Sequence, residues 1–209
     1  MQTHVTPNSA VKFISLLSYY PIDGNLGLKT DKVVVLASGG IDSTALIDFY
    51  LRQGMRVEGI HFQYGQNNGE SELKSFEKVK TFYQIEGKVI KLDFSLSKKQ
   101  DEIIGRNTVF LFVAGFSTEA KKIALGIHAD TPYYDCSRAF LRDSQKILDG
   151  YFAGTVQVDA PFIDLNKIDI LTYCTEFKVP IELTYSCQRQ NNWPCGVCPT
   201  CRELTLLRR

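Results

Sequence analysis

The sequence of 209 residues predicts an α/β protein built on a doubly wound, mainly parallel sheet of five strands. Two observations support this prediction. Short apolar runs rich in β-branched residues alternate with amphipathic segments of helical period along the chain. The polar, Gly-rich stretches follow the predicted strands, which is where ligands bind in sheets of this kind.

The first two strands and helices are indicated by periodicity and by the residues that end them. Residues 33–37 are small or β-branched and uncharged, as in a parallel strand that is buried on both faces. After a polar loop, apolar side chains recur at helical spacing between residues 45 and 50, and Gly54 supplies a helix stop. Residues 55–62 form the second predicted strand, and residues 69–84 form the helix that follows it.

The rest of the domain repeats this alternation. A polar connection, residues 95–102, separates the third strand from a helix that is rich in phenylalanine and begins near Arg106. A further helix contains Phe140 and Leu148, and Asn166 is expected to cap the last helix. The third, fourth and fifth strands are predicted at residues 88–92, 122–127 and 156–162.

Composition and charge limit the classes of protein to which the chain can belong. With 44% hydrophobic residues it can fill a core, and its net charge of +1 implies no general attraction to nucleic acid or to a membrane surface. No run of about 18 apolar residues is present, so we expect no membrane span. The expected organisation is an N-terminal extension at residues 1–31, the sheet domain at residues 32–183 and a cysteine-rich tail at residues 184–209.

A Gly-rich loop lies between the first strand and its helix, with the sequence Ser38-Gly39-Gly40-Ile41-Asp42-Ser43-Thr44. Glycines let the backbone approach a ligand closely, and the N–H groups that begin a helix have no partner within it and attract anions. The loop lacks the lysine of a Walker A loop and the G-x-G-x-x-G spacing. It therefore predicts a phosphate site of another kind, with a simple helix cap as the alternative.

Four of the six cysteines lie close together near the C-terminus. They are Cys187, Cys195, Cys198 and Cys201, in the pattern C-x₇-C-x₂-C-x₂-C. This spacing favours a tetrahedral structural zinc site, which is saturated and acts as a staple, over an iron–sulfur cluster or unligated thiols. A metal site of thiolates, in place of disulfides, indicates a reducing compartment, so we expect the protein in the cytoplasm.

The other cysteines and two histidines allow weaker expectations. Cys174 lies on an apolar helix face and is expected in the core. Cys136 lies in a loop at the ligand edge and is a candidate nucleophile, although the sequence pairs no base with it. We expect His61, inside a strand, to be structural, and His128, at a strand end, to be a candidate for ligand contact.

Together these motifs resemble the 7-cyano-7-deazaguanine synthase family of the N-type ATP pyrophosphatases. The Gly-rich loop resembles the pyrophosphate loop of that superfamily, and the resemblance extends from about residue 33 to Cys201. Its further motifs are Tyr64-Gly65-Gln66, Gly105-Arg106-Asn107, Asp135-Cys136 and the four-cysteine tail. The resemblance implies an adenine nucleotide alpha hydrolase-like fold and an ATP pyrophosphatase domain that uses ATP, Mg²⁺ and Zn²⁺.

The chain departs from the family pattern in loops. The family has Asp-Tyr-Gly-Gln-Arg-His where this chain has Gln63 before Tyr64 and Asn67-Asn68 after Gln66. Ile104 stands in place of the proline of Pro-Gly-Arg-Asn, and the loop before Asp135 is shortened. Loops at a ligand edge are where substrate choice is made, so the nitrile product is the part of the assignment that these changes affect.

The family uses ATP and ammonia to convert 7-carboxy-7-deazaguanine, through an amide, to the nitrile 7-cyano-7-deazaguanine in the queuosine pathway. The expected pyrophosphate-binding residues are Ser38, Gly39, Gly40, Asp42, Ser43 and Thr44. The expected catalytic residues are Ser38, Asp42, Ser43, Arg106 and, by resemblance alone, Lys167. The expected substrate-binding residues are Tyr64, Gln66, Arg106, Asn107 and Asp135.

Some of these residues have a structural alternative. Arg106 and Asn107 orient a carboxylate or only begin a helix, and Asp135 accepts N–H groups from a guanine-like edge or caps the next helix. Tyr64 stacks on a base or belongs to the core. Lys167 neutralises pyrophosphate or is a surface lysine at a helix start.

Three functions follow from these patterns. The first is the synthase reaction, with a deazaguanine carboxylate and ammonia as substrates, in a homodimer that has no membrane or direct nucleic-acid partner. The second is a repurposed relative that activates the same acid and joins it to an amine on another molecule, and in this case a protein is the expected kind of partner. The third is a non-catalytic nucleotide-binding module. A tRNA thiolase is disfavoured, because it needs a clear catalytic cysteine and a surface for RNA.

Overall fold

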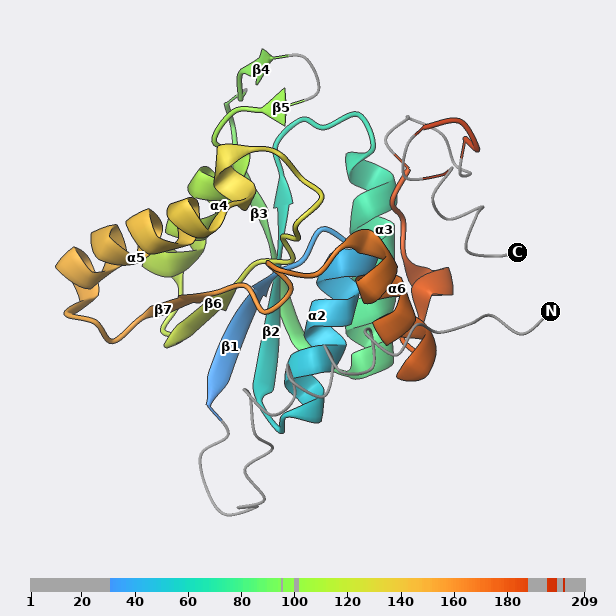
Figure 1. The fold of residues 1–209 in the computed structure, drawn as a ribbon, viewed down its shortest axis with the longest axis horizontal. Helices are drawn as coiled ribbons and strands as arrows, with labels where there is room; N and C mark the ends of the chain where they lie inside the picture. The colour runs from blue at the N-terminus through green and yellow to red at the C-terminus, as the bar shows by residue number, and fades with distance from the viewer. Residues whose placement is uncertain (1–30, 95, 100–101, 188–194, 199–200, 202–209) are drawn as a thin grey trace.

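The computed structural model describes residues 31–94, 96–99, 102–187, 195–198 and 201 (Figure 1). The strands are β1 (Lys32–Leu36), β2 (Arg56–Gln63), β3 (Glu86–Lys91), β4 (Lys98–Lys99), β5 (Glu102–Ile103), β6 (Lys122–Ala124) and β7 (Gln157–Asp159). The helices are α2 (Ile41–Arg52), α3 (Gly69–Tyr83), α4 (Arg106–Ser117), α5 (Arg138–Phe152) and α6 (Lys167–Glu176), with short 3₁₀ helices η1 (Tyr134–Cys136) and η2 (Ile181–Leu183). The expected N-terminal extension, apart from Asp31, lies outside the described residues. Within the described ranges, every helix is too short or too polar to cross a lipid bilayer.

The central sheet confirms the predicted doubly wound topology. Its five strands follow the order β3-β2-β1-β6-β7, and all neighbouring pairs are parallel. The chain runs outward from β1 through β2 to β3 and later continues on the other side of β1 through β6 to β7. The winding reverses at β1, and in sheets of this type ligands bind beside such a reversal, at the carboxyl ends of the strands. The Gly-rich loop directly follows β1.

Helices cover both faces of the sheet. Figure 1 shows α2, α3 and α6 on one face and α4 and α5 on the other. The side chains of β1 alternate between the two cores: Val33 and Val35 belong to the core under α2, α3 and α6, and Val34 belongs to the other core. All three valines are 0% exposed, as expected for a strand buried on both faces. The strand that positions the loop is therefore fixed by packing from two sides.

The fourth and fifth strands are shorter than predicted. β6 ends at Ala124, because the chain then brings Gly126 against the first turn of α2, where a Cβ would lie 3.2 Å from the backbone N of Ser43. β7 also ends before residue 162, because the carbonyl of Ala160 accepts the N–H of Ile163 at 3.1 Å and turns the chain. The residues that follow these two strands thus contribute to the ligand edge and not to the sheet.

The polar connection predicted at residues 95–102 contains a short antiparallel hairpin. β4 pairs with β5 through Lys99 and Glu102, and Figure 1 shows the hairpin projecting from the end of the sheet where η1 also lies. Strands of two residues have too few positions to show the apolar alternation by which strands are recognised in a sequence.

Candidate active site

The Gly-rich loop packs closely against α3. Gly39 has a φ of +79°, and a Cβ at this position would lie 2.4 Å from the carbonyl oxygen of Glu72. The left-handed backbone and the closeness of α3 each require glycine at this position.

Hydroxyl groups surround the N-terminus of α2. The Ser38 hydroxyl accepts the N–H of Gly40 at 3.2 Å and lies 3.2 Å from the Ser43 hydroxyl. The hydroxyls of Ser43 and Thr44 donate to the carbonyl of Gly40 at 3.1 and 2.9 Å. The turn therefore gathers hydroxyls around the first N–H groups of α2, an arrangement that can hold an anion.

Lys167 lies beside this loop, although it is 125 residues from Asp42 in the chain. Its Nζ atom is 2.5 Å from Oδ1 of Asp42, and its side chain is 11% exposed. A capping box between Asn166 and Asp169 starts α6 at Lys167, which confirms the predicted cap, and Asp130 accepts the backbone N–H of Lys167 at 2.7 Å. The surface-lysine alternative is wrong, since the lysine is largely buried. Its charge offsets that of Asp42, which alone would repel a phosphate.

Gln66 shapes the turn after β2. Its side-chain oxygen accepts the N–H of Tyr64 at 2.8 Å, and its amide donates to the carbonyl of Phe62 and to Glu72, both at 3.0 Å. The Tyr64 ring packs on Phe110, with ring centroids 5.2 Å apart. The structure thus gives both residues a role in building the edge, and their predicted contact with substrate stays a prediction.

Asp135 and Asn107 brace α4 against η1. A carboxylate oxygen of Asp135 accepts the backbone N–H of Asn107 at 3.0 Å, and the Asn107 amide donates to the carbonyl of Asp135 at 3.1 Å. The helix that Asp135 caps is therefore α4, which precedes it. The alternative that it caps the next helix is wrong, because Ser137 caps α5 by accepting the N–H of Phe140 at 3.1 Å. Recognition of substrate by Asp135 or Asn107 stays a prediction.

Arg106 brings a positive charge to this edge. Burial opposes that charge, yet the neighbours Tyr64, Asp135 and Cys136 raise the pKa of the guanidinium. Burial raises the pKa of Glu72, and the amide of Gln66 and the charge of Arg106 act in the opposite direction. Glu72 was not predicted as a site residue, because an acidic residue in the first turn of a helix reads as dipole compensation. The structure shows it at the point where the Gly-rich loop, the β2 turn and α4 meet.

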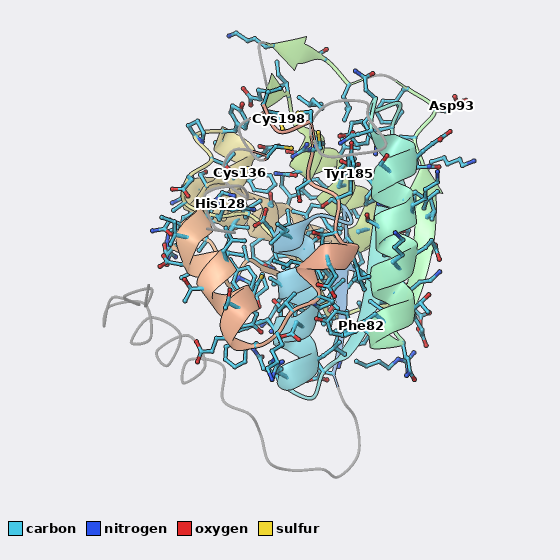
Figure 2. The ribbon with its side chains drawn as sticks, turned by 90° about the vertical axis from the view of Figure 1, so that its right-hand side faces the viewer. Phe82, Asp93, His128, Cys136, Tyr185 and Cys198 are labelled. Atoms are coloured by element: carbon cyan, nitrogen blue, oxygen red, sulfur yellow. The ribbon has the colours of Figure 1, made fainter. Side chains whose placement is uncertain are left out.

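An open groove of about 510 Å³ lies along η1. Its walls are formed by Ala129, Thr131, Pro132, Tyr133, Tyr134, Cys136, Ser137, Arg138 and Ile163. Figure 2 shows His128, Cys136, Tyr185 and Cys198 in the same half of the molecule, with Phe82 toward the opposite end. Nδ1 of His128 accepts the N–H of Asp130 at 3.3 Å, and its contact with a ligand stays a prediction.

His61 and Cys174 are structural, as expected. The ring of His61 is 1% exposed, stacks on Phe76 and has Nδ1 2.9 Å from the carbonyl oxygen of Ala37, and burial lowers its pKa. Cys174 is 2% exposed in the core beneath α6. Neither side chain is placed to contact a ligand at the carboxyl edge.

We expect Cys136 to be unreactive at neutral pH. Burial, and secondarily the charge of Asp135, raises the pKa of its thiol to about 12, so at pH 8 only about one part in ten thousand is thiolate. Iodoacetamide at pH 8 should therefore leave Cys136 unmodified in the native protein and modify it in urea, as read by peptide mass spectrometry. Rapid labelling of native Cys136 at pH 8 would restore it as a candidate nucleophile.

The four cysteines of the tail meet in space. Their sulfur atoms all lie within 4.8 Å of one another, although the sequence separates Cys187 from Cys201. The N–H groups of Val197 and Cys198 lower the pKa of Cys195 to about 6, whereas burial and the adjacent sulfurs raise that of Cys201 to about 12. Four thiolates this close together repel one another, and a metal ion bound among them would offset that repulsion.

Comparison with known proteins identifies relatives of this chain by sequence. A sequence model of the family described as queuosine biosynthesis protein QueC matches residues 32–104 and 97–205. A 7-cyano-7-deazaguanine synthase of Prochlorococcus marinus (strain MIT 9301) is 32% identical, over 85% of this chain and 93% of the relative. One of Aquifex aeolicus (strain VF5) is also 32% identical, over 83% of this chain and 94% of the relative.

Solved structures confirm the predicted adenine nucleotide alpha hydrolase-like fold. The U34-tRNA thiolase NcsA from Methanococcus maripaludis superimposes with a TM-score of 0.54 and 14% identity, covering 95% of this chain and 72% of the thiolase. At this identity the likeness shows the fold alone. The matched sequence model and the length of the matches to the synthases decide the family. The chain belongs to the QueC family of queuosine biosynthesis proteins, as a relative of the 7-cyano-7-deazaguanine synthases.

Proposed function

We propose that the chain is an ATP-dependent carbon–nitrogen ligase that converts 7-carboxy-7-deazaguanine and ammonia, through the amide, to 7-cyano-7-deazaguanine. Its family membership supports the general reaction. The observation that carries the proposal is the ion pair of Lys167 with Asp42 at the N-terminus of α2, because it adds a cation to a loop already suited to an anion.

The first step is adenylation. A carboxylate oxygen of the acid attacks the α-phosphorus of ATP in line, the α–β phosphoanhydride bond breaks, and pyrophosphate leaves. Backbone N–H groups and hydroxyls hold the β and γ phosphates, supplied by Ser38, Gly39, Gly40, Asp42, Ser43 and Thr44, with Asp42 contributing through its backbone alone. Lys167 balances the charge that grows on the leaving pyrophosphate. Such a step needs alignment and charge stabilisation and no covalent participation by the protein.

Arg106 orients the acid. Its raised pKa keeps the guanidinium charged through the accessible pH range, and the fork of N–H donors suits a carboxylate. Asp135 and Asn107 fix the start of α4 and with it the position of Arg106. The carboxylate of Asp135 also suits the paired N–H groups of a guanine-like edge, and Tyr64 and Gln66 close that side of the site.

Ammonia then attacks the acyl carbon and AMP leaves, which gives the amide and a proton. In a second cycle the amide oxygen attacks another ATP at the α-phosphorus and releases pyrophosphate. Loss of AMP and a proton from this adduct gives the nitrile. The same loop serves both cycles, so one site accounts for both adenylations.

The metals have separate roles. Mg²⁺, when bound with ATP, neutralises phosphate charge, and a carboxylate such as that of Asp42 is the kind of ligand it prefers. We assign Zn²⁺ to Cys187, Cys195, Cys198 and Cys201, where four sulfurs saturate it and leave it a structural role. Such a thiolate site needs reducing surroundings, which supports a cytoplasmic location. The homodimer stays a prediction.

Replacing Lys167 by methionine should slow the acid-dependent exchange of pyrophosphate into ATP about 100-fold to 1000-fold, because one charge on the leaving group loses its partner. Lys78→Met, at an exposed lysine on α3, is the matched control and should exchange at the rate of the wild type. Exchange by Lys167→Met within twofold of the wild type would contradict the assigned role.

The function itself is tested by identifying products. With ATP, 7-carboxy-7-deazaguanine and ¹⁵N-ammonium, mass spectrometry should find ¹⁵N-labelled amide and then nitrile, together with AMP and pyrophosphate. Adenylate without nitrile, and transfer to an added amine or protein, would favour the repurposed relative, which the changes at Gln63 and Asn67-Asn68 suggest. ATP that is bound but stays intact with this acid and with other acids would favour a non-catalytic nucleotide-binding module.

A further inference from the structure

We propose that Ser186 is a pyrophosphate-binding residue, delivered to the Gly-rich loop by the cysteine tail. The inference rests on the proposed use of that loop for pyrophosphate, and it adds a contact from the other end of the chain. Ser186 lies directly before Cys187, and the sequence gives no sign that it meets a loop 145 residues away.

Three consecutive residues bind the tail to the ligand edge, each at a different point. The N–H of Tyr185 donates to the carbonyl of Gly39 at 2.9 Å. The hydroxyl of Ser186 accepts the N–H of Ile41 at 3.3 Å. The carbonyl of Cys187 accepts from the amide of Asn68 at 3.1 Å. Residues 185–187 are thus held by hydrogen bonds against the Gly-rich loop, the start of α2 and the residue before α3.

The position of the Ser186 hydroxyl is that of a phosphate ligand. The N–H of Ile41 is the first N–H of α2, and because the Ser186 hydroxyl accepts it, this hydroxyl lies at the helix start where anions bind. A Cβ added to Gly40 would lie 3.2 Å from the hydroxyl of Ser38 and 3.4 Å from that of Ser186, so both hydroxyls lie close to the same glycine. Ser38 is already assigned to pyrophosphate, and Ser186 presents a second hydroxyl at the same place.

The chemistry of the hydroxyl allows both contacts at once. A serine oxygen accepts one hydrogen bond from Ile41 and still donates its own proton to a phosphate oxygen. A hydrogen bond from a neutral hydroxyl to a charged phosphate is stronger than a hydrogen bond between two neutral groups. Ser186 therefore supplies a donor that complements the N–H groups of the loop.

The sulfur cluster explains why Ser186 stays in place. Cys187 is a predicted metal ligand and is 2% exposed, so the residue beside Ser186 is anchored by its sulfur and by its carbonyl. An anchored donor loses little freedom when it binds, which increases affinity. The tail then acts on the nucleotide site through Ser186 without taking part in the chemistry.

The test is binding of inorganic pyrophosphate and of ATP by calorimetry, with Ser186→Ala and Ser186→Thr in the full-length protein. Ser186→Ala should weaken both ligands about tenfold, and Ser186→Thr, which keeps the hydroxyl, should restore most of the affinity. Thr184→Val is the matched control, because its hydroxyl on the same segment donates to Ile181 at 2.6 Å and should not matter for binding. Metal content and melting temperature should be unchanged in all three.

The outcomes separate the role of Ser186 from the proposed reaction. Wild-type affinity in Ser186→Ala overturns the role of Ser186 and leaves the proposed reaction intact. If Ser186→Ala binds more weakly with its metal site intact, the role of Ser186 is supported. If the wild type then shows no pyrophosphate exchange with 7-carboxy-7-deazaguanine, the substrate assignment is overturned and the role of Ser186 stands. Weaker binding accompanied by metal loss, or equally weak binding in Thr184→Val, overturns a direct contact. Failure of the wild type to bind pyrophosphate or ATP overturns both proposals.

Discussion

Gly39→Ala is expected to abolish measurable ATP binding and to destabilise the protein by about 2–4 kcal/mol. The left-handed φ of +79° disfavours any side chain, and the new Cβ would lie 2.4 Å from the carbonyl oxygen of Glu72. The loop must shift, and the shift moves the N–H groups and the Ser38 hydroxyl that would meet the phosphates. Calorimetry with ATP and urea denaturation measure the two effects.

Gly150→Ala is the control for this substitution. Gly150 lies in α5, and a Cβ there meets no atom within 4 Å. This change should leave ATP binding as it is and stabilise the protein by about 0.5–1 kcal/mol, since alanine favours the helix. If Gly39→Ala binds ATP as well as Gly150→Ala does, the loop tolerates rearrangement and the close packing described for it has no functional meaning.

Loss of the metal should also have a large effect, because binding of a structural metal ion of this kind is worth about 10–16 kcal/mol to the segment it folds. Cys198→Ser removes one of four sulfurs and is expected to lose the ion and lower the affinity for ATP. The reason is the run of contacts from Tyr185 to Cys187, which needs the tail in position to reach the loop. Metal analysis and nucleotide titration on the same sample measure both effects.

Val197→Ser is the matched control in the tail. Val197 is 46% exposed and lies between Cys195 and Cys198 in the sequence, so its side chain can change without loss of a sulfur ligand. It should keep the metal and the affinity of the wild type. A Cys198→Ser protein without metal but with unchanged affinity for ATP would show that the tail and the loop are independent.

Features encoded within a few neighbouring residues could be predicted from the sequence. The apolar residues 33–37 and the loop that follows them specify a buried strand and a phosphate turn without reference to the rest of the chain. Asn166 and the closely spaced cysteines are equally local signals, one for a helix start and the other for a metal site. The structure confirms the strand, the cap and the convergence of the four sulfurs.

Contacts between distant residues could not be predicted in this way. Aspartate is a residue type that commonly caps the helix after it, but tertiary packing directs the carboxylate of Asp135 to α4, which lies earlier in the chain. Glu72 looks like an exposed helix-start acid, and its burial depends on how Gln66 and Asn68 fold over it. Ser186 meets Ile41 only because the sheet, α6 and the tail are already assembled. Family resemblance, and not spacing, predicts Lys167 at the pyrophosphate site, and its ion pair with Asp42 is seen only in the structure.

The most direct test of the central claim is a crystal structure with the α,β-methylene analogue of ATP and Mg²⁺. The β and γ phosphates are predicted to lie on the N–H groups that begin α2, beside Gly39 and Ser43, with Lys167 in contact and the α-phosphorus facing the edge where Arg106 lies. A triphosphate bound elsewhere on the molecule, or an adenine ring in the place of the phosphates, would contradict the assignment of this loop.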